Sequence, residues 1–379
     1  MFRRWGDARV ALESLGKDRK NNIGAFRLIL ACAVIVSHSP QLLGLPSHEL
    51  LTQFGSEVSL GAIAVDGFFI LSGYLIAGSY LSKNDAAQFL FSRIRRIYPG
   101  FIAASAVCII AVAPLSGSKF PTVGELITSL GRSLILLPPE ASGAFHTLKF
   151  QALNGAMWSI RYEFRCYMLV LLLGILGLLS NRRVMMLITT SLITLLAFRA
   201  WIYFPIPKGE FHRFVFGVFG DPEQVIRLNA IFLSGACFRL LPPRVLNPRA
   251  AGAAALVTIF AVIFTQFGEV AMATTGSYAL LWAALKLKSR ILETVNSKND
   301  ISYGTYLYAW PIASLLILEA QGAGLPISPF QLTIITTILA MLAGAISWFL
   351  IESPAMQATL AFKWPTPMRA GRGAGRLRV

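Results

Sequence analysis

Long apolar segments alternate with short polar connections along the whole chain. A helix needs about 20 predominantly apolar residues to cross a bilayer. Ten segments approach that length and are predicted to span a membrane: 23–43, 58–81, 98–116, 157–179, 184–205, 225–241, 251–267, 270–288, 301–319 and 328–351. The pattern therefore predicts an all-α integral membrane protein, built as a bundle of about ten transmembrane helices.

The composition agrees with a membrane protein. Of the 379 residues, 55% are hydrophobic and only 14% are charged, whereas about 25% are charged in a soluble domain. The four cysteines all lie within apolar segments and lack metal-ligand spacing. We therefore predict neither a disulfide framework nor a metal site.

The net charge of +16 is concentrated in the short connections between the spans. If the N-terminus is cytoplasmic, 24 of the 34 lysines and arginines fall in the inner segments and five in the outer ones. Since cytoplasmic loops are enriched in Lys and Arg, this bias predicts two cytoplasmic termini and argues against a nucleic-acid partner. We expect a basic N-terminal segment (1–22), a transmembrane domain (23–352) and a basic, disordered cytoplasmic tail (353–379).

The first predicted span contains an arginine and a histidine. Arg27 and His38 are eleven residues apart, so in a helix they share a face and are about 16 Å apart along the axis. Ionisable groups are costly at membrane depth and often mark a functional site, and histidine is a natural general base. The alternative is a snorkelling arginine and a packed histidine, with Ser37 and Ser39 either orienting the ring or simply packing.

The second predicted span contains a carboxylate in apolar surroundings. Asp66 requires a cationic or hydrogen-bonded partner, and Arg27 and His38 are the two candidates that we consider. Further along, Ser72 precedes a glycine and Tyr74. A Ser-Gly pair favours either a close contact between helices or a local break in the helix.

Three arginines lie in the predicted inner connection 82–97. Arg93 and Arg96 are three residues apart and would share one face of a helix. The planar guanidinium group suits phosphate oxygens, so the pair can be interpreted as a phosphate clamp. The general excess of positive charge on the cytoplasmic side already accounts for these arginines, so on physical grounds alone it is the simpler interpretation.

Glu163 stands near the start of the fourth predicted span, with an arginine two residues away on either side. Those arginines point to other helix faces, so we expect Glu163 to face the bundle interior and to meet Arg27 or His38. The alternative is an interfacial cluster anchored by Trp158. Tyr303 opens a further aromatic cluster, which is typical of interfacial anchors.

The order of these motifs resembles the acyltransferase 3 family of membrane-bound acyltransferases, which modify surface glycans and secreted metabolites. The resemblance extends from Arg27 to about Pro354. It rests on five features: the spacing of Arg27 and His38, VDGFFILSGYLI at 65–76, the Arg-x-x-Arg of 93–96, MWSIRYEFRCY at 157–167 and SYGTYLYAWP at 302–311.

The resemblance implies an O-acyltransferase that takes an acyl group, by default acetyl, from cytoplasmic acetyl-CoA or another acyl-CoA. It would deliver that group to a hydroxyl of an acceptor on the outer side of the membrane. His38 would be the catalytic histidine, Arg27 its partner in the motif, and Glu163 a residue that positions His38 or the acceptor. Arg93 and Arg96 would bind the CoA phosphates, and the remaining candidates are Asp66, Ser72, Tyr74 and Tyr303.

The implied setting is the plasma (inner) membrane of a bacterium, with the lipid bilayer as a partner. The acceptor is a glycan or glycolipid (a lipopolysaccharide O-antigen, an exopolysaccharide or a lipid-linked oligosaccharide) or a small secreted metabolite. The chain departs from many relatives at Ala309, where they have a histidine before Trp-Pro. Whether His38 deprotonates the acceptor or itself takes the acyl group stays open, as does the oligomeric state.

Two other interpretations fit the same architecture. A multi-span transporter of an acyl donor or glycolipid would also contain intramembrane charges, although the internal repeat common in transporters is missing. An inactive scaffold is a third possibility. The presence of His38, Arg27, Arg93 and Arg96 argues against it.

Overall fold

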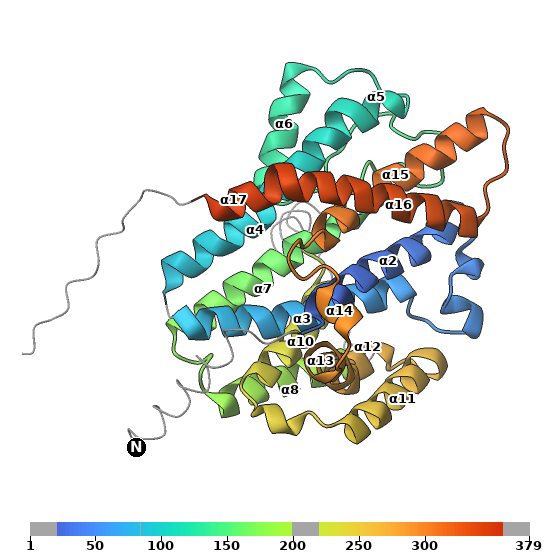
Figure 1. Ribbon diagram of the computed structural model, residues 1–379. Helices are drawn as coiled ribbons and strands as arrows, with labels where there is room; N and C mark the ends of the chain where they lie inside the picture. The colour runs from blue at the N-terminus through green and yellow to red at the C-terminus, as the bar shows by residue number, and fades with distance from the viewer. Residues whose placement is uncertain (1–20, 84, 199–219, 359–379) are drawn as a thin grey trace, which may run out of the picture.

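A computed structural model describes residues 21–83, 85–198 and 220–358. These residues form helices and connections and contain no β-strand. The longer helices lie side by side in a bundle (Figure 1). They are α2 (Ile23–Leu42), α3 (Leu60–Lys83), α4 (Ala86–Val107), α7 (Trp158–Ile175), α8 (Arg182–Phe198), α10 (Pro222–Arg239), α11 (Pro248–Phe264), α13 (Ser277–Lys286), α15 (Ser302–Gly322) and α16 (Pro329–Ser347).

Shorter elements complete the bundle. The α-helical ones are α5 (Ala113–Leu115), α6 (Val123–Leu134), α12 (Gly268–Ala271), α14 (Arg290–Thr294) and α17 (Ser353–Gln357). Four 3₁₀ turns are η1 (Pro46–His48), η2 (Thr52–Phe54), η4 (Gly155–Met157) and η6 (Pro243–Val245). Three π-helical turns are η3 (Cys108–Val112), η7 (Met272–Gly276) and η8 (Trp348–Glu352).

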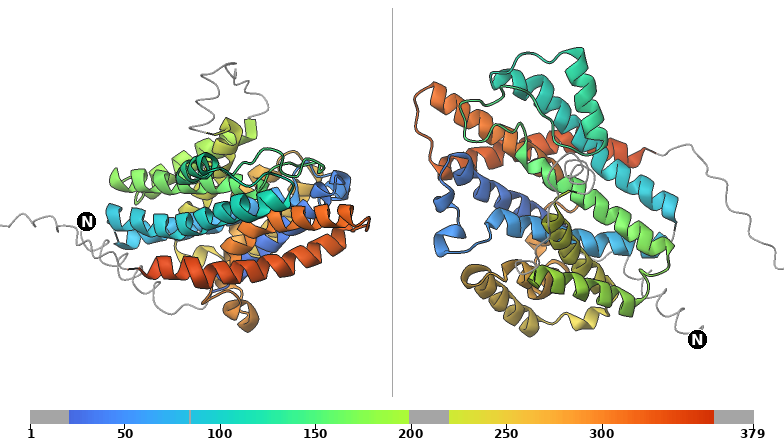
Figure 2. Two further views of the ribbon diagram at one scale, coloured as in Figure 1. Left: turned by 90° about the horizontal axis from the view of Figure 1, so that it is seen from above. Right: turned by 180° about the vertical axis from the view of Figure 1, so that it is seen from behind.

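The helix connections gather at two opposite ends of the bundle. The α2–α3 and α15–α16 connections lie together at one end, here called the Leu42 end (Figures 1 and 2). The α3–α4 and α7–α8 connections lie at the other, here called the Lys83 end. Helices that run between two such ends are the arrangement that a membrane-spanning bundle requires.

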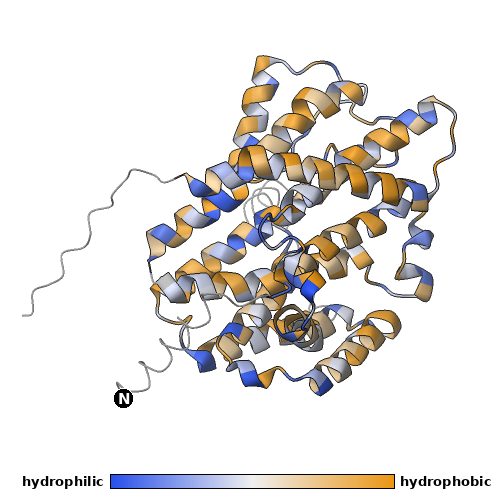
Figure 3. Ribbon diagram, in the orientation of Figure 1, coloured by the Kyte–Doolittle hydropathy of each residue, from blue (hydrophilic) through white to orange (hydrophobic). Residues whose placement is uncertain are grey.

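Among the described residues, four helical stretches are long and apolar enough to cross a membrane: Ile23–Leu42, Leu60–Ser82, Ala86–Leu115 and Pro329–Gln357. Apolar residues extend over the outer helices (Figure 3). Large apolar side chains are exposed along α11, α16 and η8, including Leu256, Phe264, Phe330 and Leu350. Such a surface would be unfavourable in water and suits lipid, so the protein is a membrane protein.

The finer topology stays a prediction. Each of the ten predicted ranges overlaps a helix in the described part of the chain, but only four stretches meet the length and composition expected of a span. The predicted fifth span, 184–205, continues past residue 198 and so lies partly outside the described residues. Residues 1–20 of the predicted N-terminal segment and residues 359–379 of the predicted tail also lie outside the described residues.

The third predicted span lies within a helix that begins well before it. Helix α4 begins at Ala86 rather than at residue 98, and Pro99 lies inside it. Asp85 caps the helix by accepting a hydrogen bond from the Gln88 amide at 2.9 Å, and Phe89 is fully buried. The cap and this buried side chain start the helix before the apolar run, so the three arginines lie on a helix and not in a connection.

Glycines allow the closest helix contacts. A Cβ atom on Gly73 of α3 would lie 1.9 Å from the Phe232 carbonyl oxygen of α10, and one on Gly235 would lie 2.1 Å from that of Ile70. Helix α3 runs unbroken through Gly73. The Ser-Gly pair therefore marks a close contact and not a break, as small residues do between membrane helices.

Candidate active site

A cavity of about 360 Å³ lies among α2, α3, α4, α7 and α15, and four arginines line it. We call it the arginine cavity. Its lining residues include Arg27, Arg93, Arg95, Arg96, Ser72, Glu163, Tyr167 and Tyr303. The sequence motifs that carry these residues are far apart along the chain. The fold thus brings six of the predicted site residues, Arg27, Ser72, Arg93, Arg96, Glu163 and Tyr303, to one place.

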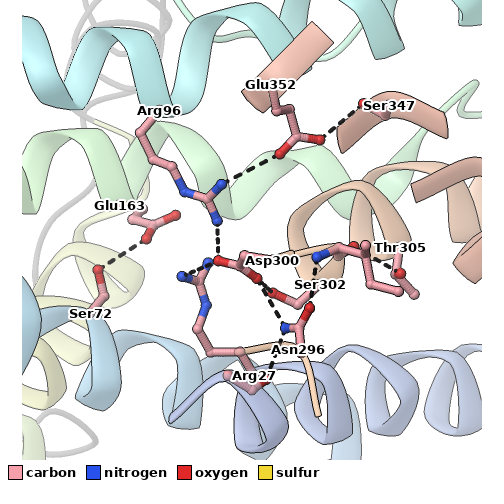
Figure 4. Close-up of polar contacts among 12 residues, drawn as sticks. Arg27, Ser72, Arg96, Glu163, Asn296, Asp300, Ser302, Thr305, Ser347 and Glu352 are labelled. Atoms are coloured by element: carbon pink, nitrogen blue, oxygen red, sulfur yellow. Dashed lines mark hydrogen bonds and ion pairs between the residues drawn. The ribbon is translucent and has the colours of Figure 1, made fainter. Parts of the chain in front are cut away.

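Two of these arginines share one carboxylate. Oδ2 of Asp300, just before α15, lies 2.8 Å from Nη1 of Arg27 and 2.5 Å from Nη2 of Arg96 (Figure 4). Its Oδ1 accepts hydrogen bonds from Ser302 at 2.5 Å and Asn296 at 3.1 Å. Burial alone would raise the pKa of Asp300, but the two guanidinium groups and these hydrogen bonds hold it well below its usual range. Asp300 therefore fixes α2, α4 and the start of α15 relative to one another.

A second carboxylate reaches Arg96 from the π-helical turn η8. Oε2 of Glu352 lies 3.5 Å from Nη1 of Arg96, and its Oε1 accepts a hydrogen bond from Ser347 at 2.9 Å (Figure 4). The Arg96 guanidinium also lies over the rings of Tyr303 and Trp348, at 5.5 and 5.8 Å from their centres. Two carboxylates and two aromatic rings thus hold this side chain.

Arg93 makes different contacts from those of Arg96. Its Nε donates a hydrogen bond to Ser92 at 3.2 Å, and its guanidinium lies 5.7 Å from the ring centre of Phe89 and 5.9 Å from that of Tyr167. No carboxylate in the described part of the chain pairs with it. Arg93 and Arg96 do share one helix face and one cavity. Of the two, Arg93 has donors left for an anionic ligand.

Glu163 faces the bundle interior, as predicted. Its Oε1 accepts hydrogen bonds from Ser72 at 3.0 Å and from the Tyr167 hydroxyl at 2.6 Å. These partners replace the predicted contact with Arg27 or His38, although Glu163 and Arg27 line the same cavity. The sequence could not show the contact with Ser72, which is 91 residues away along the chain.

His38 lies further toward the Leu42 end of α2. Its ring packs edge-on against Trp310 of α15, with the ring centres 5.1 Å apart. Nδ1 lies 3.2 Å from Oε1 of Gln41, one turn further along α2. The flanking serines do not orient the ring: Ser37 donates to buried Glu49 at 2.9 Å and Ser39 to the carbonyl of residue 35 at 2.8 Å. The packing interpretation of both serines is therefore correct.

One face of α15 connects the arginine cavity with His38. Tyr303, Tyr306 and Trp310 occur at helical spacing and so lie on one side of that helix. Tyr303 and Tyr306 line a small adjoining cavity of about 30 Å³, together with Arg27 and Glu163. The next aromatic along this face, Trp310, contacts the histidine. These side chains define a polar and aromatic path along α15, from the arginine cavity to His38.

Two of the candidates lie away from this path. Asp66 pairs with Arg227 of α10 at 2.6 Å, a partner that replaces the predicted Arg27 or His38. Tyr74 accepts a hydrogen bond from Arg239 at 3.1 Å on another side of α3. Ala309 packs with Ile35 and Ala340, so an apolar contact occupies the position of the histidine found in many relatives.

Three functional candidates escaped sequence reasoning: Gln41, Asp300 and Glu352. Each has a weak signal in hindsight. Gln41 is three residues after His38 on the same helix, and the two carboxylates stand at the ends of apolar segments, where they resemble ordinary helix boundaries. The described part of the chain contains no group of three or more His, Cys, Asp or Glu side chains placed to hold a metal ion.

Comparison with known proteins agrees with the motif order. Residues 20–352 match the acyltransferase domain that defines the acyltransferase 3 family. An O-acetyl transferase of Shigella phage Sf6 is 24% identical over 347 residues, 88% of this chain and 95% of the relative. Nodulation protein 10 of Rhizobium leguminosarum bv. viciae is 22% identical over 363 residues, 89% and 94% of the two chains. No solved structure matches the chain significantly.

Proposed function

Because the chain belongs to the acyltransferase 3 family and is an O-acyltransferase, we propose that it moves an acetyl group from acetyl-CoA to a hydroxyl of a glycan or glycolipid. The relative named as an O-acetyl transferase supports acetyl as the group transferred. Family membership sets the transporter alternative aside. The predicted topology makes the Lys83 end cytoplasmic and the Leu42 end the outer one, in the plasma membrane of a bacterium.

The observation that carries the proposal is the arginine cavity at one end of a path that leads to His38. A diphosphate requires cationic donors, and guanidinium groups supply them in suitable geometry. Arg93 forms no ion pair with a carboxylate of the described residues. The pantetheine arm would then follow α15 past Tyr303 and Tyr306. The axial separation of about 16 Å between Arg27 and His38 suits an arm of that kind.

The contact between His38 and Gln41 determines which ring nitrogen of the histidine is free to act as the base. A carboxamide oxygen can only accept a hydrogen bond, so Nδ1 of His38 carries the proton and Nε2 keeps its lone pair. Nε2 then takes the proton of the acceptor hydroxyl while the hydroxyl oxygen attacks the thioester carbonyl. The C–S bond breaks, and the thiolate of CoA leaves with the proton that Nε2 had taken, which regenerates neutral His38. Glu163, held by Ser72 and Tyr167, lies beside the incoming donor.

The test uses sealed vesicles that contain the purified protein, with labelled acetyl-CoA on the Lys83 side and candidate glycans on the other side. Wild type should transfer label to a glycan, whereas His38→Ala should transfer none while keeping its acetyl-CoA affinity. His48→Ala is the matched control, because His48 is exposed in η1. A well-folded His38→Ala protein with full activity would falsify the assignment of His38. Failure of the wild-type protein to bind any acyl-CoA would overturn the proposal that acyl-CoA is the donor.

A further inference from the structure

A second basic cavity adjoins the arginine cavity and has no role in the proposed chemistry so far. It has a volume of about 320 Å³ and lies between α3, the end of α10, the connection after it and the end of α13. We call it the Arg239 cavity. Arg239 and Lys286 line it, and none of the described Asp or Glu residues does so. Pro242, Pro243 and Val245 form an apolar wall. Its volume lies within the range of small-molecule sites, roughly 300–1,000 Å³.

Arg239 is built into this cavity. Its guanidinium lies directly over Gly78, where an added Cβ atom would be 2.6 Å from Nε. It stacks on Tyr74 at 5.3 Å from the ring centre, and Nη1 donates to the Tyr74 hydroxyl at 3.1 Å. No carboxylate of the described residues pairs with it, and Nε is buried without a partner. A guanidinium has five donors, so most of them are available to an anion.

The two cavities meet at Leu75 of α3, which lines both and is 38% exposed. Ser72 lines the arginine cavity and Gly78 lines the Arg239 cavity. These residues are six apart on one helix, so they differ by about 9 Å along its axis and by about a third of a turn around it. The second cavity therefore lies nearer the Lys83 end, on a neighbouring side of α3. A ligand that fills both would have one part deep in the bundle and the other near the end where the donor enters.

Acyl-CoA has two parts that match these two cavities. Its diphosphate is joined to the pantetheine arm, and a separate phosphomonoester sits on the ribose of its nucleotide, away from the thioester. If the arm runs toward His38, the nucleotide must face the Lys83 end. We propose that the Arg239 cavity binds the nucleotide of acyl-CoA, with Arg239 and Lys286 on the 3′-phosphate of the ribose. This inference rests on the proposed function, because it takes acyl-CoA as the donor.

The experiment compares acetyl-CoA with 3′-dephospho-acetyl-CoA as donors for protein in phosphatidylcholine vesicles. Charge-assisted hydrogen bonds to the phosphate should give wild type a KM at least ten-fold lower for acetyl-CoA. Arg239→Gln should raise the KM of acetyl-CoA about ten-fold and leave that of the dephospho donor unchanged, so that the discrimination disappears. Lys286→Gln, at an exposed position, should reduce the discrimination in the same way if Arg239→Gln folds poorly.

Arg244→Gln is the matched control. Arg244 belongs to η6 in the same connection, is exposed and does not line the cavity, so this variant should keep the wild-type discrimination. Equal KM values for the two donors in wild type would overturn the inference and leave the proposed function intact. A loss in Arg239→Gln that is equal for both donors and appears only with added phosphatidylglycerol would assign the cavity to a lipid headgroup. Failure of wild type to use either donor would overturn both proposals.

Discussion

Nδ1 of His38 lies 3.2 Å from Oε1 of Gln41, one turn further along the same helix. In the proposed mechanism, this contact selects the tautomer in which Nε2 acts as the base. Gln41→Met keeps the length of the side chain and removes the acceptor. We expect kcat to fall about ten-fold, which is the value of roughly one hydrogen bond, with the KM of acetyl-CoA unchanged. Steady-state kinetics would measure this split.

Ser39→Ala is the matched control for Gln41→Met. Ser39 is buried on the same helix and donates only to a main-chain carbonyl within it. Its loss should leave kcat within two-fold of wild type. Gln41→Glu, which keeps an acceptor at the same position, should restore much of the activity that Gln41→Met loses. Equal kcat values for wild type and Gln41→Met would rule out the positioning role.

Replacing Arg93 by glutamine and replacing Arg96 by glutamine should affect different properties of the protein. Arg96 is tied to Asp300 and Glu352, so its loss should mainly lower the melting temperature. Arg93 has no carboxylate partner in the described chain, so its loss should raise the KM of acetyl-CoA ten-fold or more and alter the melting temperature little. Thermal unfolding in detergent and donor titration measure the two effects. The reverse pattern would show that Arg96 is the phosphate ligand.

Asp300→Asn should destabilise the fold. It leaves the guanidinium groups of Arg27 and Arg96 close together without the carboxylate that they share. Breaking a buried ion pair costs about 3 kcal/mol, which corresponds to a melting temperature lower by about 5 °C. Glu140→Gln is the control, because its pair with Arg132 is 74% exposed on the carboxylate side and such pairs contribute little. Equal small shifts for both variants would contradict the bridging role of Asp300.

The stabilising effect of Asp300 should depend on pH in acid. Burial raises its pKa, and Arg27 and Arg96 more than reverse this, so that the folded pKa lies below the usual range. The unfolded carboxyl titrates near pH 4. The stabilisation is therefore complete above about pH 4 and is lost as the pH falls toward the folded pKa. The difference in melting temperature between wild type and Asp300→Asn should shrink below about pH 4, and a constant difference would exclude a depressed pKa.

Gly73→Ala should prevent proper packing of α3 on α10, since the new Cβ atom would lie 1.9 Å from the Phe232 carbonyl oxygen. Neither helix backbone can move by the required distance without disturbing its other contacts. We expect loss of monodisperse protein in detergent, measured by size-exclusion chromatography. Gly131→Ala in α6 is the control: nothing lies within 4 Å of the added atom, and alanine favours a helix by about 1 kcal/mol. Normal behaviour of Gly73→Ala would refute the close contact.

The sequence by itself determined the helical membrane architecture and the family, because the length and apolarity of a span are local properties and the motif order is linear. It also placed Arg93 and Arg96 on one helix face and Glu163 in the interior, because helical periodicity fixes which residues share a side. Only the tertiary structure decided which charges pair. Asp300 joins Arg27 and Arg96 across gaps of more than 200 residues, and Asp66 meets Arg227. A carboxylate requires some partner at that depth, but which one it finds depends on how the helices pack, and no local pattern encodes that.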